Sequence, residues 1–306
     1  MPINIPNELP ATQALLDENI FVMNQDRAMH QDIRPLKLLF LNLMPHKITT
    51  ELQYMRKLSN TPLQVNIDLL RVDSHEPKHT PIEHLEAFYK NFDEIKDRKY
   101  DGMIVTGAPL DRMDFSDVNY FRRLERILNW ANCHVTSTLF SCWGVAAALK
   151  IFYDIPLYHR QEKLSGVFLQ HTLNQSNPLV RGFDDAFYMP QSRFIDFPLD
   201  VIEKIDDIDI LASSPVCGLT LGASKDLKRV FVTGHPEYDT DTLDGEYRRD
   251  LNKGMDIAMP CNYYPQDNKD LPPVCRWRSH ASMLFANWLN YYVYQETPYS
   301  FDGKLG

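Results

Sequence analysis

Cys142 lies between two predicted elements. Residues 135–140 before it form a predicted strand, and residues 144–149 after it are small or apolar residues that favour a helix. A tight strand-to-helix turn projects its central side chain above the sheet, and the N–H groups at the positive end of the helix favour thiolate over thiol. Cys142 is therefore a candidate nucleophile. From its position alone, a small buried apolar residue is the commoner alternative.

A candidate base lies in residues 231–238, Phe-Val-Thr-Gly-His-Pro-Glu-Tyr. His235 and Glu237 are two residues apart, so in an extended segment both side chains lie on the same side, and Pro236 restricts the backbone between them. A carboxylate beside an imidazole fixes its tautomer and stabilises the imidazolium that forms when the ring takes a proton. The pair predicts a general base with its orienting carboxylate. Without the cysteine, a polar surface turn would be the better interpretation.

The loop Thr-Gly-Ala-Pro at 106–109 follows another predicted strand, at 102–105. It should therefore lie at the same edge of the sheet as Cys142. Backbone N–H groups here, with Leu110 and Trp143 as candidates, could hold the oxyanion of a tetrahedral intermediate. A plain strand-terminating turn is an equal alternative.

Alternating strand and helix patterns position these residues. Strands are predicted at 38–43, 65–69, 102–105 and 135–140, the first of them central, with helices near 48–58, 81–92 and 118–130. This alternation predicts an α/β fold with right-handed crossovers and a doubly wound, mostly parallel sheet flanked by helices, which binds ligands beyond the carboxyl ends of its strands. Later elements are predicted as short strands at 167–169, 208–212 and 229–233, helices near 243–254 and 279–292, and a surface loop at 260–273.

Composition excludes several classes of function. The 306 residues are 44% apolar and 24% charged, enough for a sizeable core. A formal net charge of −9 argues against nucleic acid as a partner, and neither a signal peptide nor a membrane span is predicted. The five cysteines have no C-x-x-C spacing, which argues against a disulfide framework and a metal site and fits a reducing cytoplasm. They are Cys133, Cys142, Cys217, Cys261 and Cys275.

These motifs together resemble the homoserine O-succinyltransferase/O-acetyltransferase family. The resemblance runs from Met1 to about Pro298 with little change in spacing. It is carried by the segments at 106–109, 140–144 (Phe-Ser-Cys-Trp-Gly), 162–166 (Glu-Lys-Leu-Ser-Gly), 181–184 (Arg-Gly-Phe-Asp), 191–193 (Gln-Ser-Arg), 231–239, 277–280 (Trp-Arg-Ser-His) and 287–292 (Asn-Trp-Leu-Asn-Tyr-Tyr).

The resemblance implies a fold like the class I glutamine amidotransferases and transfer of an acyl group from coenzyme A to the hydroxyl of L-homoserine in methionine biosynthesis. It implies one acyltransferase domain over 1–306, with an N-terminal arm (1–34), a catalytic core (35–298) and a tail (299–306), usually as a homodimer. No permanently bound cofactor is expected; acyl-CoA is a co-substrate.

The same resemblance assigns roles to individual residues. Cys142 matches the nucleophile, His235 the base and Glu237 its partner. The substrate-contacting positions match Lys163, Ser192 and Arg249, the last of which grips the amino-acid carboxylate. The expected mechanism is ping-pong: Cys142 attacks the thioester, CoA leaves, and homoserine activated by His235 attacks the acyl-enzyme.

Asp111 is the candidate for donor specificity. In the family a glycine there goes with succinyl-CoA and a glutamate with acetyl-CoA, and this chain has neither. Two unit charges about 4 Å apart repel by roughly 4 kcal/mol at an effective dielectric near 20, which disfavours the free carboxylate of succinate. The sequence therefore predicts acetyl-CoA, with succinyl-CoA as the alternative because Arg112 could neutralise Asp111 or bind succinate.

Two other functions use the same residues. A glutaminase of the amidotransferase type has a similar Cys and His-x-Glu arrangement, and the motifs around the triad argue against it. A binding protein with a decayed site is disfavoured because nucleophile, base and carboxylate are all present.

Overall fold

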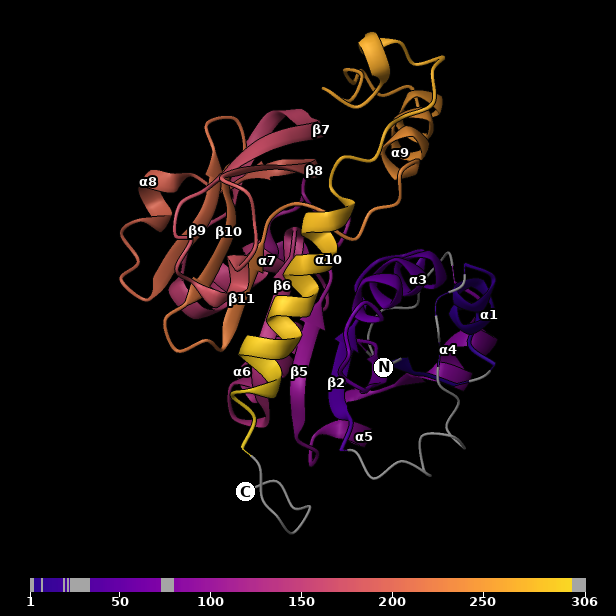
Figure 1. The fold of residues 1–306 in the computed structure, drawn as a ribbon, viewed down its shortest axis with the longest axis vertical. Helices are drawn as coiled ribbons and strands as arrows, with labels where there is room; N and C mark the ends of the chain where they lie inside the picture. The colour runs from indigo at the N-terminus through magenta and orange to yellow at the C-terminus, as the bar shows by residue number, and fades with distance from the viewer. Residues whose placement is uncertain are drawn as a thin grey trace.

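The computed structural model describes residues 3–6, 8–18, 20, 22, 34–72 and 80–298. Their strands form one mixed sheet of eleven strands (Figure 1). The order along the sheet is β1-β3-β2-β5-β6-β11-β10-β9-β7-β8, and β4 pairs with β3. The predicted tail at 299–306 and most of 19–33 lie outside the described residues.

One half of the sheet is parallel, as the alternating pattern predicted. It consists of β1 (Ile3–Asn4), β3 (Val65–Leu70), β2 (Leu36–Leu41), β5 (Tyr100–Val105), β6 (Val135–Ser141) and β11 (Arg229–Val232), with β4 (Tyr89–Lys90) beside β3. Every residue of β5 is buried, because a central parallel strand is covered on both faces.

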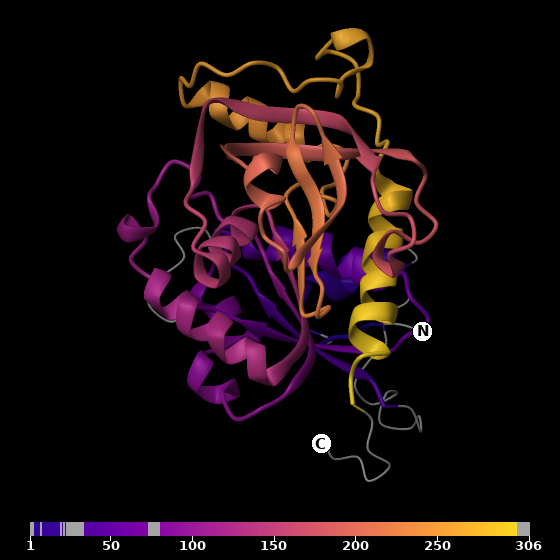
Figure 2. The same ribbon diagram turned by 90° about the vertical axis from the view of Figure 1, so that its left-hand side faces the viewer.

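Helices cover both faces of this half, so the predicted doubly wound arrangement is confirmed. Leu38 and Phe40 of β2 pack in a core with α3 (Lys47–Leu58) and α10 (Arg278–Asn287). Leu39 and Leu41 point to the opposite core, with α6 (Phe121–His134) and α7 (Trp143–Tyr153). In Figure 2 the magenta helices and yellow α10 lie on opposite sides of the strands.

The other half of the sheet is antiparallel, and part of it was not predicted. It contains β10 (Gly218–Ser224), β9 (Ile208–Ser214), β7 (Tyr158–Thr172) and β8 (Ala186–Asp196). The predicted short strand at 167–169 is the middle of β7, which has fifteen residues. β8 and β10 were missed because β8 contains Pro190 and buried polar residues, and β10 consists largely of small residues. An edge strand such as β8 tolerates proline.

The remaining elements are short or lie near the ends. The predicted helix at 81–92 is interrupted by β4, which separates α4 (Ile82–Phe88) from α5 (Phe92–Ile95). At the N-terminus α1 (Pro10–Asp17) buries Leu15 in the core. The predicted helix at 279–292 is α10 followed by a π-helical segment, η4 (Trp288–Tyr294). The others are η1 (Phe115–Asp117), η2 (Pro178–Val180), α8 (Leu199–Ile202), α9 (Thr242–Asn252) and η3 (Pro265–Asp267).

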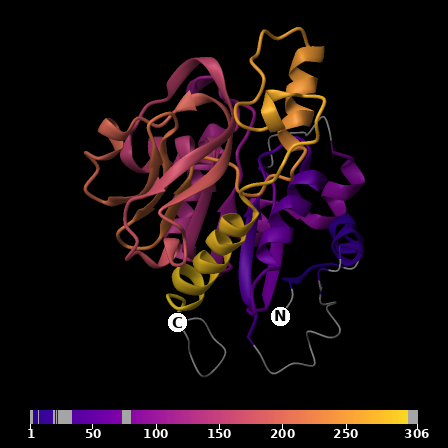
Figure 3. The ribbon, with the colours of Figure 1, turned by 45° about the horizontal axis from the view of Figure 1, so that its top comes forward.

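After β11 the chain crosses the upper end of the molecule. Figure 3 shows α9 and the loop that follows it at this end, before the chain descends into α10. The predicted surface loop at 260–273 is mostly exposed, although Tyr263 and Tyr264 are buried. No described helix is long and apolar enough to cross a membrane.

Candidate active site

Cys142 occupies the tight turn between β6 and α7. Its backbone has φ 47° and ψ −115°, a conformation that a residue with a side chain seldom adopts. Its N–H donates to the carbonyl of Val232 at 2.9 Å, which ties the turn to the end of β11. Gly144 lies so close to the end of β5 that an added Cβ would be 2.8 Å from the carbonyl oxygen of Thr106. The glycine therefore allows α7 to begin directly against the neighbouring strand.

His235 and Glu237 contact one another, but through a turn and not through the predicted extended segment. His235 Nδ1 and Glu237 Oε1 are 2.7 Å apart. The Tyr238 N–H donates to the carbonyl of His235 at 3.3 Å, which closes the turn. The Tyr238 ring stacks on the imidazole with centroids 4.1 Å apart. The bond and the stacking fix the orientation of the ring.

The three predicted catalytic side chains form one buried group. Cys142, His235 and Glu237 are 4%, 5% and 4% exposed. Burial alone would lower the pKa of His235, but the charges of Cys142 and Glu237 and side-chain hydrogen bonds to both raise that pKa well above its usual value. The ring of His235 therefore contacts both Cys142 and Glu237, so it is placed to exchange a proton with the thiol while the carboxylate orients it.

The predicted oxyanion loop lies against the turn of Cys142. A Cβ added to Gly107 would be 3.2 Å from Cys142 Cβ and 3.7 Å from the backbone nitrogen of Trp143. Trp143 is the first residue of α7, so its N–H has no acceptor within the helix. The N–H of Leu110 already donates to the carbonyl of Ala108 at 2.8 Å. An oxyanion would compete with that carbonyl, which weakens the prediction for Leu110.

Lys163, Ser192 and Arg249 join one network with two carboxylates of α9. Lys163 Nζ lies 2.8 Å from Asp250 Oδ2 and 3.7 Å from Glu246 Oε2. Ser192 Oγ donates to Glu246 at 2.5 Å, and Arg249 Nε donates to Asp250 at 2.8 Å. The structure thus brings the three predicted substrate-contacting residues together.

Tyr238 connects this network to the group of Cys142, His235 and Glu237. Its hydroxyl donates to Glu246 Oε1 at 2.8 Å while its ring stacks on His235. Glu246, Asp250 and Tyr238 were not predicted as site residues. Glu246 and Asp250 are four apart and so share one face of a helix, a spacing that could have pointed to them.

Asp111 lies near the same group. Its Oδ2 accepts the N–H of Phe194 at 3.0 Å. Burial raises the pKa of Asp111, while the Phe194 N–H and the nearby charges of His235 and Lys163 partly oppose that shift. Arg112, considered as its neutralising partner, has its guanidinium over the Phe194 ring, 3.9 Å from the centroid.

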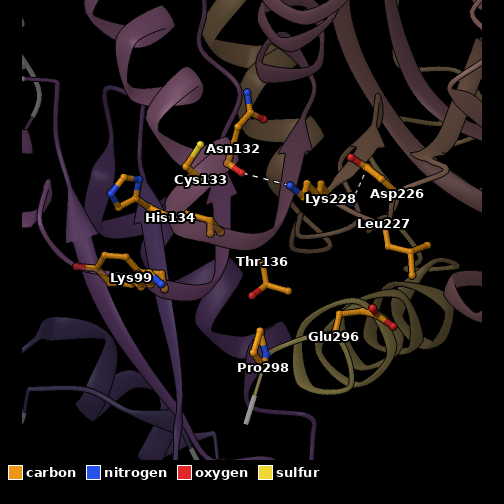
Figure 4. A pocket seen from close by; sticks show the side chains of 12 residues that line it. Lys99, Asn132, Cys133, His134, Thr136, Asp226, Leu227, Lys228, Glu296 and Pro298 are labelled. Atoms are coloured by element: carbon orange, nitrogen blue, oxygen red, sulfur yellow. Dashed lines mark hydrogen bonds between the residues drawn. The ribbon is translucent and has the colours of Figure 1, made fainter. Parts of the chain in front are cut away.

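A separate pocket lies at the opposite end of the parallel strands. It has a volume of about 290 Å³ and is lined by residues before β5, at the start of β6 and before β11, among them Lys99, His134 and Lys228 (Figure 4). Since Cys142 follows the carboxyl end of β6, this pocket is not the catalytic site. No cluster of three or more potential metal-binding side chains occurs within the described part of the chain.

Comparison with solved structures defines the class. A glutamine amidotransferase from Thermotoga maritima covers 84% of this chain, with 98% of that chain aligned, at a TM-score of 0.54 and 12% identity. A glutamine amido transferase from Methylobacillus flagellatus aligns over 85% of this chain and 95% of its own, with a TM-score of 0.52 and 12% sequence identity. The fold is thus that of the glutamine amidotransferase-like α/β proteins, here with a cysteine, a histidine and a glutamate grouped at the edge of the sheet.

Sequence comparison identifies the family. The chain belongs to the homoserine O-succinyltransferase family, whose model matches residues 2–299. A homoserine O-acetyltransferase from Succinatimonas hippei is 68% identical over 98% of this chain and 99% of its own. A homoserine O-succinyltransferase from Yersinia pestis is 58% identical over 98% of this chain and 97% of its own. One from Aliivibrio fischeri is 55% identical over 99% of this chain and 96% of its own.

Proposed function

We propose that this protein is a homoserine O-acyltransferase of methionine biosynthesis, which transfers an acyl group from acyl-CoA to the hydroxyl of L-homoserine. The observation that carries the proposal is the buried group of Cys142, His235 and Glu237 in a chain that matches the family over nearly its whole length.

The proposed reaction has two half-reactions. Cys142 thiolate attacks the thioester carbon, and the oxyanion that forms is held by the Trp143 N–H and by N–H groups of the 106–109 loop. The carbon–sulfur bond to CoA breaks, and His235 gives its proton to the departing thiolate. His235 then takes the proton of the homoserine hydroxyl as the oxygen attacks the acyl-enzyme, which releases the ester and restores the Cys142 thiolate.

The charged network around α9 suits an amino acid as acceptor. A zwitterion needs cations for its carboxylate and anions for its ammonium group, and the network offers Arg249 and Lys163 together with Glu246 and Asp250. Arg249 Nε and Nη2 both contact Asp250, but the side chain is 48% exposed, so part of its guanidinium is accessible to a ligand.

Burial of the thiol favours transfer over hydrolysis. Cys142 is only 4% exposed, so little solvent reaches the thiol. The same covering keeps water from the acyl-enzyme until homoserine arrives.

Succinyl-CoA is the first candidate for the donor, because the family model and the relatives from Yersinia pestis and Aliivibrio fischeri carry the succinyltransferase name. The predicted preference for acetyl-CoA is not confirmed. It stays the second candidate for a specific reason: Asp111 places a carboxylate near His235, and the 68% identical relative is named an acetyltransferase.

A matrix of donors and acceptors tests the proposal. CoA release is measured with acetyl-, succinyl- and propionyl-CoA against homoserine, serine, glutamine and water. Cys142→Ala should lose at least about a thousandfold in kcat, and substantial turnover would refute the nucleophile. Asp111→Gly should raise kcat/KM for succinyl-CoA relative to acetyl-CoA. An unchanged ratio would exclude Asp111 as the filter, and ammonia release from glutamine would support the glutaminase instead.

Two further properties belong to the proposal. The family resemblance supports a homodimer, and the scattered cysteines support a cytoplasmic location. Analytical ultracentrifugation tests the first, and fractionation of cells that produce the tagged protein tests the second.

A further inference from the structure

Tyr54 connects helix α3 to the residue that precedes Cys142. Its hydroxyl donates to Ser141 Oγ at 2.7 Å, and both residues are fully buried. The Tyr54 ring packs against Phe40, with centroids 5.1 Å apart, and meets Phe285 edge-on at 5.9 Å. Since two rings confine it, the hydroxyl is held in one position.

The turn after Ser141 needs such support. The φ of 47° at Cys142 is costly for a residue with a side chain, and conformations of this kind persist only where the surroundings hold them. Tyr54 comes from an element remote in sequence and satisfies a buried hydroxyl next to the strained residue. The pKa of Tyr54 is raised well above its usual value by burial and then by the charges of Glu237 and Cys142, which agrees with a hydroxyl close to both.

The same helix also holds the segment that follows the base. Arg56 of α3 donates to Asp239, just beyond the turn of His235, at 2.5 Å. Gln53 donates to Thr242 Oγ1, at the start of α9, at 3.0 Å. One helix therefore contacts both the strand end that carries the nucleophile and the segment that carries its base.

We propose that α3 aligns the two halves of the catalytic group, and that Tyr54 is the positioning residue on the nucleophile side, acting through Ser141. The inference rests on the proposed role of Cys142 as nucleophile. Tyr54 affects the orientation of the Cys142 thiol relative to His235 and not the binding of either substrate.

A double-mutant cycle on the full-length protein tests it. Tyr54→Phe and Ser141→Ala each remove the same hydrogen bond, so each should lower kcat by about tenfold with KM within about twofold, and the double variant should lose about tenfold and not a hundredfold. Tyr292→Phe is the matched control. Tyr292 is also buried, and its hydroxyl donates to Asn177 at 2.9 Å, a bond that joins η4 to the start of η2 and not to the turn at Cys142.

A second measurement does not depend on turnover. The rate of iodoacetamide alkylation at Cys142 is followed against pH by peptide mass spectrometry. Tyr54→Phe and Ser141→Ala should slow it severalfold at pH 6 and move its midpoint to higher pH, because a misaligned thiolate loses contact with the imidazolium. Tyr292→Phe should leave both unchanged even where it lowers Tm.

Three outcomes overturn the inference. In the first, Tyr54→Phe lowers Tm but matches the control variant in kcat and in the alkylation rate. In the second, the losses in kcat of the two single variants multiply in the double variant, and in the third, the variants change KM alone. Should the wild type release no CoA with any acceptor, the proposed function fails, while the alkylation profiles still decide whether Tyr54 positions the thiol. If Tyr54→Phe does not fold, Ser141→Ala supplies the same comparison.

Discussion

Gly144 is where a single methyl group should disturb both stability and catalysis. A Cβ added to it would be 2.8 Å from the carbonyl oxygen of Thr106 and 3.0 Å from that of Val105. Both contacts are with the backbone, so no flexible side chain can move aside. Replacing Gly144 by alanine must therefore push the start of α7 away from β5.

The expected size follows from two opposing effects. Overpacking a close contact costs about 1–3 kcal/mol, whereas replacing a helical glycine by alanine contributes at most about 1 kcal/mol of stability. Gly144→Ala should thus lower the free energy of unfolding by about 1–2 kcal/mol and Tm by roughly 2–6 °C. The displaced helix carries the Trp143 N–H and the Cys142 turn, and a shift near 1 Å can cost about a hundredfold in rate, so kcat should fall at least tenfold.

Gly245 provides the matched control. It is an exposed glycine of α9, and a Cβ added to it meets nothing within 4 Å. Gly245→Ala should raise stability by about 0.5–1 kcal/mol through helix propensity alone. Thermal unfolding and steady-state kinetics on both variants give the comparison. If Gly144→Ala matched the wild type in Tm and kcat, the close contact between α7 and β5 and its role in placing Cys142 would be refuted.

Three further substitutions separate charge, recognition and scaffold. Glu237→Gln should lower kcat/KM by about 10²–10⁴, because the imidazolium loses its buried partner. The pKa of His235 is raised in the folded state, so the stability linked to its protonation is present below about pH 6.5 and is lost as pH rises through the folded pKa. The Tm deficit of the variant should therefore be largest in acid, and a deficit independent of pH would contradict this. Arg249→Lys should raise KM for homoserine about tenfold with kcat little changed, because lysine lacks the planar fork; an unchanged KM excludes carboxylate binding there. Asp101→Asn should lower the free energy of unfolding by about 2 kcal/mol without affecting kcat. This buried carboxylate accepts from Arg34 at 2.6 Å and from the Lys37 N–H at 2.7 Å, at the end of β5 opposite to Cys142. Denaturant unfolding measures the stability, and steady-state kinetics measure kcat.

Local patterns were sufficient for the longer strands of the parallel half, but not for the two-residue strands β1 and β4. The apolar runs in β2 and β5 and the helical spacing of α3 and α6 are properties of short segments, because a buried strand or an amphipathic helix needs apolar residues at fixed intervals. The turn at Cys142 and the close spacing of His235 and Glu237 are equally local. These features could be predicted without knowledge of which segments meet.

The antiparallel half could not be predicted in the same way. Polar residues such as Gln191 and Arg193 are fully buried in β8, where Arg193 donates to Gln191 within the strand and to the carbonyl of Cys217 outside it. A polar residue in an unknown context predicts exposure, so β8 showed no strand pattern. The identity of its neighbours, and not its own composition, makes this segment a strand.

The sequence alone therefore determined which residues could do chemistry and which edge of the sheet should carry them. Only the tertiary structure decided how Cys142 meets His235, which acidic residues face Lys163, and that Tyr54 contacts the residue before Cys142. Those contacts join segments between 87 and 93 residues apart in the chain. Their geometry depends on how helices and strands pack, which no short stretch of sequence specifies.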